Sequence, residues 1–70
     1  MVSREEAIKI ATDAALEWYE DDGVQPVDFV EAYQEDDGDW IVCFKVYGWL
    51  TSEWRVSEYK GLKSADIIGG

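Results

Sequence analysis

The N-terminal amphipathic segment limits the possible folds most, because much of its apolar face is alanine. Ser3 and Glu6 have the S-x-x-E spacing of a capping box, which predicts a helix from residue 4 to about residue 20. At about 100° per residue, the apolar side chains fall within one half of the helix surface. They are Ala7, Ile8, Ile10, Ala11, Ala14, Ala15, Trp18 and Tyr19. Because alanine permits close approach, this face predicts a helix that packs directly on a sheet.

Residues 27–35 and 40–47 predict two strands joined by a hairpin. Asp37-Gly38 between them is a strong signal for a two-residue turn, since both central positions of such a turn need φ > 0. The strand face toward the helix would then carry Val27, Phe29, Tyr33, Trp40, Val42, Phe44 and Val46. The outer face would carry Val30, Ala32, Ile41, Cys43 and Tyr47.

This turn would place Tyr33 opposite Val42, but it would also place Glu31 on the apolar face. Two explanations are open: either Glu31 lies at an edge, or a bulge near Val30 changes the register. A third strand is predicted within residues 52–59, where Trp54 and Val56 alternate with polar residues. Residues 61–70 fit a short helix or an edge strand equally well.

These segments predict one α+β domain over residues 1–70, with an N-terminal helix on a three-stranded antiparallel sheet and an undecided C-terminal segment. The chain has no histidine, and its one cysteine, Cys43, lies in a predicted strand without a base or cation to activate it. The sequence contains no phosphate-binding loop, and the acidic turn does not follow the ligand spacing of a calcium loop. We therefore expect no enzyme activity, no cofactor and no metal site.

The net charge of −10 opposes direct binding to nucleic acid or to an anionic membrane. The chain has neither a long apolar run nor the basic-then-apolar order of a signal peptide, so we expect a cytoplasmic protein. Residues 10–44 contain no lysine or arginine, and this half of the chain holds the whole acidic excess. The predicted helix and turn would arrange these acids as a band about 25–30 Å long.

We expect this band to bind a partner through eight acidic residues, with Trp49 as an apolar anchor in the loop after Gly48. The acidic residues are Asp13, Glu17, Glu20, Asp21, Asp22, Asp36, Asp37 and Asp39. Acids in the last turn of a helix oppose its dipole and cost about 0.3–1 kcal/mol each at low salt. Such a cost without local compensation is typical of functional sites. The alternative is that the acidity serves solubility or adaptation to high salt.

Two resemblances suggest functions. Glu17-x-x-Glu20-Asp21-Asp22 and Glu35-Asp36-Asp37-Gly38-Asp39, in a small acidic α+β chain, make it similar to the phage-encoded DNA mimics that include anti-CRISPR proteins. That resemblance implies an inhibitor, monomeric or homodimeric, that occupies the basic nucleic-acid-binding groove of a protein or ribonucleoprotein.

Residues 3–46 also resemble PepSY-like modules. The likeness rests on Ser3-x-Glu5-Glu6-Ala7-Ile8-x-Ile10-Ala11 and on the hairpin that leads to Trp40-x-Val42. This resemblance implies a regulatory binding module. Its binding surface would be the outer sheet face around Ile41, Cys43, Tyr47 and Trp54.

Overall fold

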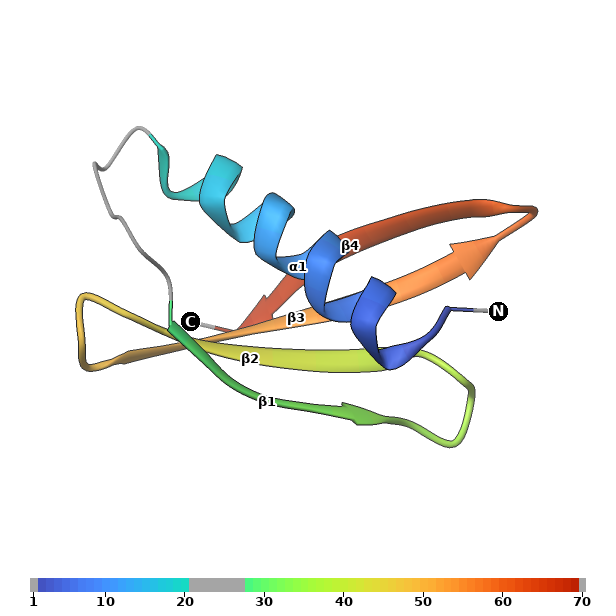
Figure 1. Cartoon of the computed structure of the whole chain (residues 1–70), viewed down its shortest axis with the longest axis horizontal. Coiled ribbons are helices and arrows are strands. Elements are labelled where there is room, and N and C mark those ends of the chain that lie inside the picture. The colour runs from blue at the N-terminus through green and yellow to red at the C-terminus, as the bar shows by residue number, and fades with distance from the viewer. Residues whose placement is uncertain (1, 21–27, 70) are drawn as a thin grey trace.

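The chain folds into one helix and a four-stranded antiparallel sheet, and the helix covers one face of that sheet (Figure 1). The structure is a computed structural model that describes residues 2–20 and 28–69. The elements are α1 (Arg4–Trp18), β1 (Asp28–Gln34), β2 (Trp40–Val46), β3 (Leu50–Tyr59) and β4 (Leu62–Gly69). The strands lie in the order β1-β2-β3-β4. The α+β class is confirmed, but the sheet has four strands rather than three, because the C-terminal segment forms an edge strand.

The predicted capping box begins helix α1. The Ser3 hydroxyl accepts from the Glu6 backbone N–H at 3.1 Å, and the Glu6 carboxylate accepts from the Ser3 N–H at 3.2 Å. Ala7, Ala11 and Ala15 are completely buried, so the helix backbone lies directly on the sheet as the alanine face predicts. These alanines pack above Val42, Phe44, Trp54 and Val56, which form the main core with Val2.

The helix ends at Trp18, two residues earlier than expected, and Tyr19 is its C-cap. Trp18 is 59% exposed, so its assignment to the buried face was wrong. Its ring meets the buried Trp54 ring edge-on at 6.0 Å. Tyr19 is buried and packs with Val46 and Leu50 in a second, smaller cluster. This cluster joins the C-terminal end of the helix to the end of β2 and the start of β3.

The predicted register of the first hairpin was wrong by one residue. The Gly38 N–H donates to the Glu35 carbonyl at 3.0 Å, and the Glu35 N–H donates to the Asp39 carbonyl at 2.8 Å. Residues 36–38 therefore form a three-residue loop, with Gly38 at φ 94°. Because neighbouring side chains in a strand point to opposite faces, the shift places Ala32 opposite Val42 and moves Tyr33 to the outer face.

A β-bulge then reverses the faces again. The pairing shifts between Phe29 and Glu31, which confirms the predicted bulge near Val30, and Glu31 itself is exposed on the edge strand β1. Phe29 thus returns to the helix side, where its ring meets Phe44 at 6.5 Å. Glu31 pairs with Cys43 on the outer face. The register of the three-residue turn therefore keeps the Glu31 carboxylate out of the core, and the bulge returns Phe29 to the core side.

Two tight turns connect the remaining strands at opposite ends of β3. Tyr47 and Gly48 join β2 to β3 with φ of 58° and 81°, and Lys60 and Gly61 join β3 to β4 with φ of 51° and 81°. The β3 strand has the predicted alternation, with Trp54 and Val56 buried and facing the helix. None of the helices in the described part of the chain has the length and apolar character needed to span a membrane.

Candidate functional site

The acidic residues that were expected to form one continuous band lie on two separate parts of the molecule. Asp13, Glu17 and Glu20 are exposed on the helix side. The acidic residues Asp36, Asp37 and Asp39 belong to the β1–β2 turn, at the end of the sheet where the Trp40 indole N–H donates to the Val2 carbonyl at 3.0 Å. This turn lies near the start of α1, far from the C-terminal end of the helix (Figure 1). Asp21 and Asp22 lie outside the described residues.

Arg55 of β3 holds the acidic turn through three carboxylates. Its guanidinium lies 2.8 Å from Glu35, 3.1 Å from Asp39 and 3.5 Å from Asp37. The Ser57 hydroxyl adds a hydrogen bond of 2.9 Å to Asp39. The bond to Asp39 and the nearby acids raise the pKa of Arg55. Three of the four acids of this turn thus share the single positive charge of Arg55, and Asp36 is the turn acid with no ion pair among the described residues.

The acids of the helix are differently placed. Asp13 forms an (i, i+4) pair with Lys9 at 3.0 Å, but both side chains are largely exposed, at 64% and 76%, and such pairs contribute little to stability. Glu17 and Glu20 are exposed and have no ion pair among the described residues, and the last turn of the helix holds no basic residue. Their charges add to the negative end of the helix dipole. The strongest uncompensated negative potential of the helix is therefore at its C-terminal end.

Two exposed aromatic side chains lie at this same end of the molecule. Trp49 is 73% exposed and Tyr47 is 52% exposed, and their rings stack with centroids 6.3 Å apart and an interplanar angle of 26°. The contact of Tyr19 with Val46 and Leu50, which flank the turn, brings the helix end to this position. The sequence marked Trp49 as an anchor, but it placed Tyr47 on the outer sheet face and not in the turn beside Trp49. The signal for Tyr47 was a bulky residue before Gly48, in a turn that favours asparagine or aspartate.

Ile41 and Cys43 contribute little exposed surface to the outer sheet face. They are only 1% and 7% exposed, although no helix of the described residues covers this side. Trp54 lies on the helix side and Tyr47 lies in a turn, so the surface expected around Ile41, Cys43, Tyr47 and Trp54 is not one continuous face.

The chemistry of this face gives no support for a reactive thiol. Burial raises the pKa of the Cys43 thiol, and the neighbouring Glu53 and Glu31 raise it further. Burial also raises the pKa of the Tyr33 phenol. Cys43 is thus a buried strand residue, as the sequence predicted.

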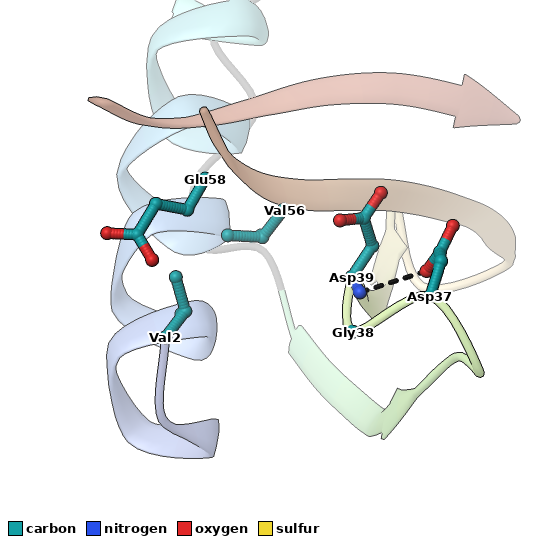
Figure 2. Close-up of a pocket in the computed structure, with 6 residues that line it drawn as sticks. All are labelled: Val2, Asp37, Gly38, Asp39, Val56 and Glu58. Carbon is teal, nitrogen blue, oxygen red and sulfur yellow. Dashed lines mark hydrogen bonds between the residues drawn. The ribbon is translucent and has the colours of Figure 1, made fainter. Parts of the chain in front are cut away.

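A pocket of about 260 Å³ lies between the N-terminal segment, the β1–β2 turn and β3 (Figure 2). Its lining consists of Val2, Asp37, Gly38, Asp39, Val56 and Glu58. The Asp39 N–H donates to the Asp37 carboxylate at 3.0 Å, which orients that carboxylate within its own turn. Among residues 2–20 and 28–69, no three metal-binding side chains are grouped so that they could hold an ion.

No protein-family model matches the sequence, and comparisons with curated proteins and with solved structures find no match. The chemistry of the surface therefore has to carry the functional argument. The candidate site is the end of the molecule that combines the last turn of α1 with the β2–β3 turn. It contains Glu17, Glu20, Tyr47 and Trp49, and we call it the helix-end surface.

Proposed function

We propose that the protein is an acidic inhibitory interaction protein that occupies a basic nucleic-acid-binding surface of a partner protein or ribonucleoprotein. One observation carries this proposal: Glu17 and Glu20 are exposed at the negative end of a helix whose last turn has no basic residue. A sequence selected for stability alone would place lysine or arginine there. The proposal requires no catalytic residue and no cofactor.

The spacing of the helix acids supports an imitation of phosphates. Asp13 and Glu20 are seven positions apart, which corresponds to about 10 Å along the helix axis at about 1.5 Å per residue. Four successive phosphates of one DNA strand, three steps of about 3.4 Å, cover a similar length. Glu17 lies between the two residues, so the helix and the residues directly after it present three carboxylates over this distance.

The mechanism follows from long-range attraction and steric exclusion. The net charge of −10 speeds the approach to a positively charged groove. Once bound, the folded domain blocks nucleic acid from the same lysines and arginines. Because exposed charges are screened as the Debye length shortens, binding should weaken steeply between about 0.1 and 0.5 M salt.

The test is capture of partners from a bacterial lysate by the immobilised protein, followed by competition with duplex DNA. We expect the wild type to retain nucleic-acid-binding proteins that duplex DNA or added salt releases. A Glu17→Gln, Glu20→Gln variant should lose them. A Glu31→Gln, Asp66→Asn variant makes the same change in net charge on exposed positions of the sheet and should retain them.

Equal capture by both variants would overturn the assignment of the binding surface to the helix end. Capture that resists both salt and duplex DNA would overturn the mechanism itself. All four substituted side chains are exposed, so we expect the fold to be unchanged. Circular dichroism of each variant verifies this.

A further inference from the structure

We propose that the stacked rings of Tyr47 and Trp49 bind an arginine side chain of the basic partner. This inference rests on the proposed function and specifies which residue type the helix-end surface recognises. It depends on three independent features: a strained turn backbone, rings without a cation of the described residues over them, and carboxylates at the same end of the molecule.

The backbone of the turn holds Tyr47 in a conformation that bulky residues rarely adopt. Its φ of 58° lies in the left-handed region, where asparagine, aspartate or glycine would fit at lower cost. The Trp49 N–H donates to the Val46 carbonyl at 3.2 Å and closes the turn. Although both rings remain more than half exposed, they stack on each other. Strain that presents exposed aromatic rings in a fixed orientation is typical of a binding site.

Two other exposed rings of this protein, those of Phe29 and Tyr59, already bind a cation of the chain. The Arg4 guanidinium lies over Phe29 at 5.8 Å from the ring centre, and the Lys60 ammonium lies over Tyr59 at 5.4 Å. No such cation lies over Tyr47 or Trp49 in the described part of the chain. Tryptophan has the aromatic face that attracts cations most strongly. The ring pair is therefore an aromatic surface suited to a cation that residues 2–20 and 28–69 leave open.

The charges nearby select a cationic ligand and favour arginine over lysine. Glu17 and Glu20 lie at the same end of the molecule, and they repel anions and attract basic side chains. The planar guanidinium of arginine stacks on an aromatic ring while its N–H groups remain free to bond to a carboxylate. The ammonium of lysine has no plane to stack and is more strongly hydrated.

The experiment compares binding of labelled oligoarginine and oligolysine peptides of equal length, measured by fluorescence anisotropy at fixed salt. We expect the wild type to bind oligoarginine more tightly. Trp49→Ala should weaken oligoarginine binding about two- to fivefold, the range for an exposed cation–π contact. It should change oligolysine binding less. The matched control is Tyr59→Ala, which removes another exposed ring at the opposite end of β3 and should preserve the preference for arginine.

Formation of the indole contact should also be visible by NMR, because the Trp49 indole N–H signal should shift on addition of oligoarginine. The inference is overturned if the wild type shows no preference for arginine, or if Trp49→Ala keeps it. It is also overturned if Tyr59→Ala removes the preference equally. In each of these cases the proposed function still stands or fails on the capture experiment with the Glu17 and Glu20 variant.

Discussion

Ser52 shows how one small polar side chain can fix the packing of much larger ones. It is the buried polar residue of the described chain, and its hydroxyl oxygen accepts from the Tyr19 hydroxyl at 3.0 Å and from the Trp54 indole N–H at 2.9 Å. Tyr19 caps the helix and Trp54 lies in the middle of β3. The bond from Tyr19 therefore ties the helix end to the sheet, and the bond from Trp54 within β3 uses the same Ser52 oxygen.

Removal of the Ser52 hydroxyl, which accepts both bonds, should lower the free energy of unfolding more than removal of the Tyr19 hydroxyl, which donates one of them. Ser52→Ala leaves the Tyr19 and Trp54 donors buried without a partner, so we expect a loss of about 1–3 kcal/mol in the free energy of unfolding. Tyr19→Phe leaves Ser52 bonded to Trp54 and should cost about 0.5–1.5 kcal/mol. Urea denaturation of both variants measures the difference. A smaller cost for Ser52→Ala than for Tyr19→Phe would contradict the described role of Ser52.

Cys43 should behave as an unreactive thiol in the folded protein. Burial and the adjacent carboxylates raise its pKa, which lowers the fraction of thiolate near neutral pH. We expect modification by a chromogenic disulfide reagent to be slow in buffer and fast in denaturant. Equal rates in the two solvents would show that the strand is open to solvent.

At the scale of elements, the contact between Lys63 and Glu6 joins β4 to the first turn of the helix. Their side chains lie 2.6 Å apart. The hydrogen bond from Lys63, followed by the bond to the Ser3 backbone, lowers the pKa of Glu6 below its ordinary value of 4.5. A carboxylate whose pKa is lower in the folded than in the unfolded protein stabilises the fold at a pH above its unfolded pKa. This stabilisation is lost as the pH falls through the folded pKa.

Lys63→Met should therefore be less stable than the wild type near neutral pH. The difference should shrink as the pH falls below about 4.5, because Glu6 becomes protonated in both proteins. Thermal unfolding at several pH values measures this convergence. A difference that stays constant down to the most acidic pH would show that Lys63 acts through packing and not through the carboxylate.

The elements also show what the sequence could and could not predict. The capping box at Ser3 and the alanine face were sufficient to predict the helix and its packing on the sheet, because both are local patterns with one structural solution. The register of the first hairpin could not be predicted, because Asp37-Gly38 fits both a two-residue turn and the last two residues of a three-residue loop. The C-terminal segment was undecided for a related reason: Leu62, Ala65, Ile67 and Ile68 fit helical spacing as well as a strand, and pairing with β3 decides between them.

The candidate site was predictable in part. Glu17, Glu20 and Trp49 could be selected from the sequence, because an acidic last helical turn and a tryptophan after glycine are local signals. The ion pairs of the turn acids could not be predicted, because they depend on Arg55, which is 16 or more positions away from these acids in the chain. Only the register of β2 on β3 brings this arginine to the acidic turn.

At the scale of the whole molecule, the strong negative charge raises the question of whether the fold needs salt. The described core consists of a main cluster and a smaller one, and it contains no buried side-chain polar atom without a hydrogen-bond partner. We therefore expect cooperative thermal unfolding even at low ionic strength, with only a modest rise in melting temperature on addition of salt. Unfolding in low-salt buffer would instead support salt adaptation as the reason for the acidity.

Finally, the simple order of the strands determines how quickly this chain can reach its native state. Each strand pairs with the strand that precedes or follows it in the sequence, and short turns close all three hairpins. Contacts that are close in sequence require only short loop closures, and proteins rich in them fold rapidly. The sheet can therefore form hairpin by hairpin, and the helix completes the core by covering one side of it. An inhibitor built in this way would become active soon after its synthesis.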